Sequence, residues 1–427
     1  MSHRGTLTED LTRVDLTDPS AFLHPGMEDF WRRARTEQPV YLHPATERGT
    51  AFWVVSRYAD VMAVLQDSEH FSSKPGNMMS SLHKPGGDPA AGKILALTDA
   101  PRHNAMRSIL LKAFSPRTRK AVTDKLQQRV DQLIGSAMAK GTFDFAKEVA
   151  EAIPMGMICD LLGFPSQDHQ YLLDLSQKAL STDEDGLTAE DIWLSRNELL
   201  IYCQEIIEAR RENPQDDLIS AMATSEINGV PMTDDEVVVN CYGFILAGDH
   251  TSRLAMIGAV HAFSRYPDQW RALKEGRVQI SSAIEEILRW TTPAMHTGRT
   301  AKAEVTIGGR TIREGDHVIL WNSSANRDED VFPNPQVFDL ARTPNKHLSF
   351  GAGSHFCFGS YLARAEITAV LKTLCATVDR IELAGDPKPL LSTFLSGYSS
   401  LPVSFVTDES VVTDESAAFV TGESAAQ

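Results

Sequence analysis

One segment of the chain restricts the possible folds more than any other. Residues 232–267, MTDDEVVVNCYGFILAGDHTSRLAMIGAVHAFSRYP, form the longest helical pattern in the sequence, and Pro267 ends it. Thr233 and Glu236 have the spacing of a capping box, which marks where this helix begins. The predicted helix is apolar on nearly all of its sides, and such a helix belongs in the centre of a large domain. We therefore expect a fold built around one buried central helix.

The flanking segments predict more helices and a small amount of β-structure. Residues 52–71 contain a short β-branched strand followed by a helix, and helical patterns dominate residues 102–211. A further helix is expected in SSAIEEILRW, and AEVTIGGRTIREGDHVILW alternates as a β-hairpin does. Residues 72–93 are rich in Gly, Pro, Ser and Lys and predict a long loop. The predicted fold class is mainly α with a small β portion.

The two ends of the chain differ from its middle. Residues 20–405 show no change of composition, and we predict that they form a single domain after an N-terminal extension of residues 1–19. Residues 406–427 contain VTDES twice and VTGES once, with five acidic and no basic side chains. A segment this short and polar cannot bury a core, so it predicts a disordered acidic tail.

The charge and the cysteine content exclude several classes of protein. The 427 residues include 57 acidic and 41 basic side chains, a formal net charge of −16, which argues against a nucleic-acid partner. Five cysteines without a C-x-x-C spacing indicate a reducing compartment. No apolar stretch is long enough to cross a membrane, and the first residues are polar, unlike a secretory signal. We expect a soluble, cytoplasmic protein.

Cys357 lies in the segment HLSFGAGSHFCFGSYLARAE, which indicates a functional site more clearly than any other part of the sequence. Gly351, Gly353 and Gly359 let the backbone approach a bulky group, and a helix pattern follows directly. The dipole and free N–H groups of a helix N-terminus stabilise a thiolate, as is needed for a sulfur ligand on a metal. The alternatives are a buried structural cysteine and a zinc site, although zinc would need more ligands than His355 and Cys357.

This segment resembles the haem-binding signature of the cytochrome P450 superfamily, F-x-x-G-x-H-x-C-x-G. The matching residues are Phe350, Gly353, His355, Cys357 and Gly359. The resemblance covers residues 20–405 and implies the cytochrome P450 fold, a long central helix over the haem, and haem b as cofactor. It implies that the Cys357 thiolate is the proximal iron ligand, which favours O–O cleavage, that Phe350 shields the sulfur, and that His355 faces a propionate. Phe358 departs from the family, which usually has an aliphatic residue there.

An acidic and a basic residue upstream match a second motif of this family. Glu286 and Arg289 lie at i and i+3, so they share one face of a predicted helix. Alone, such a pair is usually a solvated surface contact. In this order along the chain it resembles the E-x-x-R motif. The resemblance implies a structural pair that ties its helix to the meander before the haem loop.

Three basic residues match positions that hold the haem propionates in the family. His103 and Arg107 lie at i and i+4 in DAPRHNAMRSILLKAFSPR, and Arg299 precedes the predicted hairpin. Each alone would be read as a surface cation. Together they resemble the family's propionate-binding set, because Arg and His donors suit two carboxylates held near an apolar macrocycle.

The sequence AGDHTSR in the central helix resembles the family's oxygen-activation groove, A-G-x-[D/E]-T. The resemblance implies that Ala247 and Gly248 adjoin the haem and that Thr251 helps to deliver protons, although such a hydroxyl often simply bonds to a carbonyl one turn earlier. Here Asp249 precedes His250, so a histidine occupies the usual acid position. Neighbouring helix residues point about 100° apart and do not substitute for each other. Three roles stay open: His250 relays protons, Asp249 contacts substrate, or proton delivery is atypical.

The resemblance also implies a substrate pocket, an apolar cavity with a few polar points such as His296, Asp249 and Tyr398. Its expected residues are Met78, Met79, Leu82, Phe244, Ala247, Ala294, Met295, His296, Ser396, Gly397 and Tyr398.

The expected reaction is a monooxygenation that uses O2, two electrons and two protons to hydroxylate or epoxidise a small organic molecule. The electrons would come from a separate ferredoxin and ferredoxin reductase, and Arg117, Arg119 and Lys120 could form part of the docking face. One alternative is oxidative coupling or ring closure, on a free or a carrier-bound intermediate. Another is a haem sensor without turnover.

Overall fold

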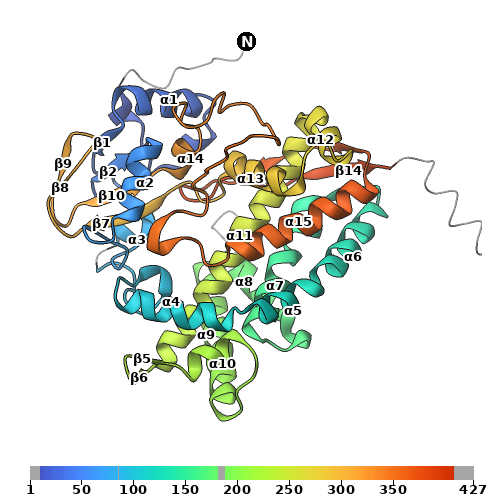
Figure 1. Ribbon diagram of the computed structural model, residues 1–427, viewed down its shortest axis with the longest axis horizontal. Coiled ribbons are helices and arrows are strands. Elements are labelled where there is room, and N and C mark those ends of the chain that lie inside the picture. Colours follow the sequence, from blue (N-terminus) through green and yellow to red (C-terminus); the bar gives the residue numbers. More distant parts are fainter. Residues whose placement is uncertain (1–9, 85, 181–187, 408–427) are drawn as a thin grey trace, which may run out of the picture.

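The computed structural model describes residues 10–84, 86–180 and 188–407, and its architecture is mainly helical with a smaller β region to one side (Figure 1). The helices are α1 (Met27–Glu37), α2 (Tyr58–Gln66), α3 (Met79–Leu82), α4 (Arg102–Ala113), α5 (Pro116–Asp124), α6 (Leu126–Met138), α7 (Ala152–Leu162), α8 (His169–Leu180), α9 (Ala189–Glu212), α10 (Leu218–Ala223), α11 (Asp234–Arg265), α12 (Pro267–Lys274), α13 (Ile280–Thr291), α14 (Asn322–Ala325) and α15 (Ser360–Thr377).

The strands are short and form one five-stranded, one three-stranded and three two-stranded sheets within these residues. They are β1 (Val40–His43), β2 (Phe52–Val55), β3 (Phe71–Ser72), β4 (Thr142–Asp144), β5 (Glu226–Ile227), β6 (Val230–Pro231), β7 (Thr297–Ala301), β8 (Val305–Ile307), β9 (Arg310–Ile312), β10 (His317–Leu320), β11 (Arg380–Leu383), β12 (Lys388–Pro389), β13 (Tyr398–Ser400) and β14 (Pro402–Val406). The largest sheet has the order β1-β2-β10-β7-β3, in which β2 and β10 are parallel and the other pairs antiparallel. The predicted fold class is confirmed.

Helix α11 is the central helix that the sequence predicted. Its capping box is formed, because Thr233 accepts from the Glu236 N–H and the Glu236 side chain accepts from the Thr233 N–H. At 1.5 Å per residue, its 32 residues span about 48 Å. It packs against α7, α9, α13 and α15, and its apolar side chains belong to the largest core cluster. Helix α13, before the haem signature, and helix α15, which follows it, therefore pack against the same helix.

The described part of the predicted N-terminal extension packs onto the domain. Leu11, Val14 and Leu16 are buried in a core cluster with Trp31 of α1 and Trp321. Folded structure therefore begins before residue 20. The predicted tail lies outside the described residues from position 408 onward.

Local predictions held in part. The hairpin forms between β8 and β9. The segment predicted as one long loop, residues 72–93, contains the single-turn helix α3. Pro154 lies in the first turn of α7, where a missing N–H is tolerated. Among the helices of the described ranges, none has the length and continuous apolar character that a bilayer crossing requires.

Candidate functional site

The loop that carries Cys357 contains a glycine at a position where a side chain would be strained. Gly353 has a φ of +69°, and a Cβ there would lie 2.4 Å from the carbonyl oxygen of Leu65. The loop then closes on itself, since the Cys357 N–H donates to the Phe350 carbonyl over 2.9 Å. Helix α15 begins at Ser360, three residues later. The sulfur is thereby placed at the start of α15.

The surroundings of the Cys357 sulfur both disfavour and support a thiolate. Burial raises the pKa of the Cys357 thiol, while the N–H groups of Gly359 and Ser360 and the charges of Arg107 and Arg364 act in the opposite direction. A free thiol would therefore stay protonated, whereas a bound metal would deprotonate it. In the described part of the chain, no three His, Cys, Asp or Glu side chains are placed to hold a metal together. A metal that brings most of its own donors, as haem iron does, fits this lone sulfur.

Four basic side chains, His103, Arg107, Arg299 and His355, meet beside the loop. The rings of His103 and His355 lie 4.1 Å apart, and Arg107 donates to the Phe356 carbonyl over 2.7 Å. Arg299 of β7 is buried and donates to the Gly298 carbonyl, and burial lowers its pKa to about 10. Burial and the neighbouring cations lower the pKa of His355 to about 3.

Within the described residues, none of these four side chains forms an ion pair with Asp or Glu, although Asp99 lies close enough to raise the pKa of Arg299. A narrow cavity lined by Asp99, Arg299 and His355 adjoins them. Burying the Arg299 guanidinium without a full counter-charge is costly, and the imidazoles of His103 and His355 can donate their N–H groups, so the cluster fits a ligand with two carboxylates.

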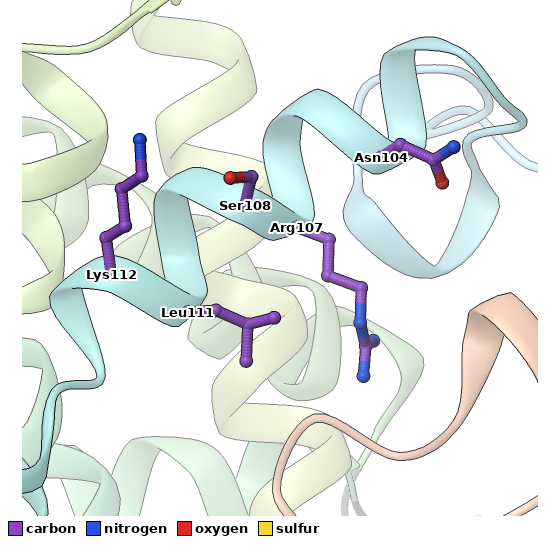
Figure 2. A pocket seen from close by; sticks show the side chains of 5 residues that line it. All are labelled: Asn104, Arg107, Ser108, Leu111 and Lys112. Carbon is purple, nitrogen blue, oxygen red and sulfur yellow. The ribbon is translucent and has the colours of Figure 1, made fainter.

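The outer face of α4 is hollowed next to the Cys357 loop. Figure 2 shows this cavity of about 350 Å³, lined by Asn104, Arg107, Ser108, Leu111 and Lys112. Arg107 points from α4 toward the loop that it bonds. Leu111 is half exposed here, and Phe356 and Tyr361 are the exposed aromatic residues nearest in the chain to Cys357. This surface combines apolar side chains with positive charge.

The predicted basic docking run is weaker than its sequence suggested. Arg117 lies 3.8 Å from Asp216, and Lys120 pairs with Asp124 at 2.7 Å. The Arg119 guanidinium stacks over the Tyr361 ring at 4.9 Å. Much of the positive charge of this run is therefore neutralised or held against an aromatic ring.

Glu286 and Arg289 form a fully buried ion pair. Two hydrogen bonds of 2.7 and 2.8 Å join them, and both side chains have no solvent exposure. Arg289 also donates to the carbonyls of Asn326 and Pro335, and Arg342 donates to Glu286. The pair thus ties α13 to the meander that precedes the Cys357 loop.

The oxygen-groove residues point to different sides of α11. Ala247 is exposed although its helix is central, which marks the open face. Thr251 Oγ1 donates to the Ala247 carbonyl over 3.3 Å. A Cβ on Gly248 would lie 2.6 Å from Ile158, so this glycine lets α7 approach α11. Asp249, two residues after Ala247, lies on the opposite side of the helix and is fully buried. This burial argues against one of the three open roles, in which Asp249 contacts substrate.

Several predicted pocket residues are core residues. Met79, Leu82 and Met295 belong to the core cluster around Trp321, at 3%, 5% and 6% exposure. His296 accepts from the Met79 N–H, and its ring packs on Trp321. These four side chains fill the space between α3, β7 and β10 and do not line an open cavity, which corrects the prediction for them.

The remaining predicted pocket residues are spread over different surroundings. Phe244 packs on Phe358 with ring centroids 5.5 Å apart, and Tyr398 packs on His261 at 4.6 Å. A Cβ on Gly397 would meet Leu254. Three further residues, Met78, Ala294 and Ser396, are partly exposed. Ala294 forms an isolated antiparallel β-bridge with Leu395.

The sequence interpretation missed a clasp over α11. Asn240 accepts from the Leu95 N–H and donates to the Lys93 carbonyl, both over 2.9 Å. Between these residues Ile94 packs onto Gly243, where a Cβ would lie 2.1 Å from Ile94. The signals available in the sequence were a polar residue, Asn240, and a glycine, Gly243, inside an apolar helical pattern.

Comparisons with known proteins agree with this geometry. Residues 189–377 match the family model described as Cytochrome P450. The cytochrome P450 NovI of Streptomyces niveus is 43% identical over 404 residues, which cover 94% of this chain and 99% of NovI.

Two solved structures extend the comparison to the fold. P450 OxyD, described as involved in the biosynthesis of vancomycin-type antibiotics, has a TM-score of 0.85 at 32% identity, covering 92% of this chain and 100% of that one. PksS, the cytochrome P450 of the bacillaene polyketide synthase of Bacillus subtilis 168, has a TM-score of 0.80 at 29% identity, covering 90% and 98%. This chain belongs to the cytochrome P450 family. It is a cytochrome P450 monooxygenase with haem b as its cofactor.

Proposed function

We propose that this enzyme hydroxylates or epoxidises a small organic molecule of secondary metabolism, with Cys357 as the proximal iron ligand. The observation that supports this most is the sulfur of Cys357 at the start of α15, beside four basic side chains that form no ion pair with Asp or Glu among the described residues. When bound, the haem activates O2 for insertion into the substrate.

The residues around the haem have separate tasks in this proposal. His103, Arg107, Arg299 and His355 bind the propionates, and Phe350 shields the sulfur. Thr251 holds its proton on the Ala247 carbonyl until the reaction requires it. Glu286 and Arg289 keep the meander and the haem loop in place.

We expect electrons to enter from a ferredoxin, reduced by a ferredoxin reductase, at the α4 surface. The hollow beside α4 presents Arg107 and Lys112, with Leu111 and Phe356 exposed nearby. An acidic partner would meet positive charge around an apolar centre there. The acidic remainder of the chain would disfavour other docking orientations. We expect the enzyme to act in the cytoplasm, without a nucleic-acid or membrane partner.

The substrate is either free or bound to a carrier, and the similar proteins favour testing both. OxyD is described as an antibiotic-biosynthesis enzyme and PksS as part of a polyketide synthase system. Oxidative coupling or ring closure is the second candidate reaction on the same grounds.

Binding and product analysis test the proposal. Free small molecules and the same molecules joined as thioesters to a carrier protein are added to the haem-loaded enzyme. We expect one of the two sets to shift the Soret band from low spin to high spin. With ferredoxin and its reductase, the product should gain one oxygen atom. Loss of two hydrogen atoms without added oxygen would show coupling instead, and binding without any product would contradict an enzymatic function.

A further inference from the structure

Three exposed lysines leave positive charge open on the surface between the C-terminal end of α15 and the hollow beside α4. Lys112 belongs to the last turn of α4, Lys125 lies between α5 and α6, and Lys372 belongs to α15. Within the described ranges of the chain, none of the three forms an ion pair, unlike Lys120, which pairs with Asp124. A binding partner with negative charge therefore has three free cations to meet here.

Two of these lysines lie along one face of α15. Tyr361 and Lys372 are both exposed and are eleven residues apart, which is close to three helical turns, so they share the outer face of this helix. Helix α6 packs along α15, and the Gln127 amide of α6 donates to Thr373 Oγ1 over 2.9 Å. This bond places Lys125, two residues before Gln127, beside the same stretch of α15.

The outer face of α15 joins the surface of α4 at its other end. The Arg119 guanidinium of α5 lies over the Tyr361 ring, 4.9 Å from its centroid. Next to them, Leu111 and Phe356 are exposed, and Leu111 and Lys112 line the hollow. A continuous face of basic and apolar side chains thus leads from the C-terminal half of α15 to the hollow.

The described chain ends where this face begins. Strand β14 pairs antiparallel with β11, and Val406 of β14 lies opposite Arg380 of β11. Arg380 follows the last residue of α15, Thr377, by three positions. The chain therefore reaches position 408 beside the C-terminal end of α15, from which α15 leads back toward α4 and α5 (Figure 1).

Residues 408–427 complement this face in charge and in length. They carry five acidic and no basic side chains, and Phe419 follows the second VTDES repeat. An extended chain spans about 3.3 Å per residue, so the twelve residues from Asp408 to Phe419 reach about 40 Å. At 1.5 Å per residue, α15 covers only about 24 Å between Thr377 and Tyr361. The segment is therefore long enough to bring Phe419 to the hollow beside α4.

We propose that residues 408–427 bind back along the outer face of α15 and occupy the α4 surface at which the ferredoxin docks. The acidic repeats lie over the three lysines, and Phe419 packs against Leu111 at the hollow. The segment competes with an acidic ferredoxin because both present negative charge to the same cations. Its attachment to the domain gives it an effective concentration on the order of millimolar. The competition rests on the proposed function, whereas the binding of the segment to its own domain does not.

The first test locates the segment and requires no electron transfer. The haem-loaded, full-length enzyme is treated with a carbodiimide, which joins a carboxylate directly to a lysine in contact with it, and the linked peptides are identified by mass spectrometry. We expect links from the acidic repeats to Lys112, Lys125 and Lys372. These links should be lost at about 1 M salt, where the screening length falls to about 3 Å.

Two exposed lysines of other elements, Lys84 after α3 and Lys178 of α8, are the controls for this test. Equal yields of links to the control lysines, or no links to the proposed three, would overturn the proposal. The reaction is repeated on a mixture of nitrogen-15-labelled and unlabelled enzyme. Both peptides of a link should carry the same label, because the segment binds its own domain. Mixed labels would show contact between two copies and would overturn the proposal.

The apolar contact has a test that leaves the charge unchanged. In Phe419→Ser, we expect the yield of links to Lys112 to fall several-fold, while the links to Lys372 remain, because Phe419 anchors only the distant part of the segment. Phe419→Leu keeps an apolar side chain and should retain the links to Lys112. Equal yields at Lys112 in Phe419→Ser and the wild type would contradict the packing of Phe419 against Leu111.

The second test measures the competition with a ferredoxin. One variant neutralises the first two repeats, and its substitutions are Asp408→Asn, Glu409→Gln, Asp414→Asn and Glu415→Gln. We expect its dissociation constant for an acidic iron–sulfur ferredoxin to be about tenfold lower than that of the wild type at low salt, because the internal competitor is weakened. At high salt the difference should disappear.

A matched control removes the same number of charges from another surface. It neutralises four exposed glutamates of α9, with the substitutions Glu190→Gln, Glu205→Gln, Glu208→Gln and Glu212→Gln. Its affinity for the ferredoxin should change much less than that of the repeat variant. An equal gain of affinity in the control would show a general effect of net charge and would overturn the proposal.

The two tests distinguish the possible failures. If no ferredoxin reduces the enzyme, the proposed electron donor fails, while the carbodiimide links still decide whether the segment binds its own domain. If the links form and the repeat variant binds the ferredoxin no more tightly than the wild type, the segment does not cover the docking surface, and the proposal is overturned.

Discussion

Two glycines of the haem signature are required for different reasons. At Gly353 both the backbone conformation and the Leu65 carbonyl, 2.4 Å from an added Cβ, exclude a side chain. Gly359 has a φ of −81°, and an added Cβ would meet only the Cys357 sulfur, at an ordinary 4.0 Å. The protein alone therefore does not require glycine at 359. The space is explained by the bulky group that the sulfur binds.

This difference predicts that two alanine substitutions affect different properties of the protein. Gly353→Ala should destabilise the protein with or without haem, by about 1–2 kcal/mol for the left-handed backbone alone. Gly359→Ala should leave the unfolding of the haem-free protein nearly unchanged and weaken haem binding. Thermal unfolding with and without haem, together with haem titration, measures both effects. Equal stability of Gly353→Ala and the wild type would contradict this explanation.

At the scale of elements, a buried ion pair between Glu286 and Arg289 holds α13 in place. Arg289 holds α13 against the meander through carbonyls of residues far along the chain. Sequence spacing placed Glu286 and Arg289 on one helical face, yet the same spacing is common on exposed helices. Their complete burial depends on the packing of the meander, which no local pattern encodes.

The burial of this pair predicts a large cost for breaking it. Among the described residues, Arg289→Met leaves Glu286 with Arg342 as its one cation, so we expect a loss of about 3–5 kcal/mol in the free energy of unfolding and reduced haem retention. Asp124→Asn is the control, because it breaks the exposed Lys120–Asp124 pair and should cost about 1 kcal/mol or less. Chemical denaturation measures both, and a similar loss in the two variants would contradict the assigned role.

At the scale of the whole molecule, the sequence predicted what depends on local signals. The capping box and apolar character defined α11, and the glycines and cysteine defined the haem loop. The direction in which side chains point depends on distant contacts and was predicted less well. Contact with substrate was one of the open roles of Asp249, but helix geometry turns its side chain toward Glu366 and Arg253.

Long-range packing explains the other differences as well. Met79 and His296 were expected in a pocket wall, but α3 carries Met79 onto the Trp321 cluster, where His296 accepts its N–H. Leu11 and Leu16 lie in a polar N-terminal segment that showed no periodicity, and they became core residues because α1 and Trp321 cover them. Contacts between residues so far apart leave no trace in either local sequence.

The central claim is that the Cys357 thiolate binds the haem iron, and one spectrum tests it most directly. The haem-loaded enzyme is reduced in the presence of carbon monoxide, and its Soret band is compared with that of Cys357→His. The wild type should show the strongly red-shifted band of thiolate ligation, and Cys357→His should lose it while still binding haem. A wild-type spectrum typical of histidine ligation would contradict the account.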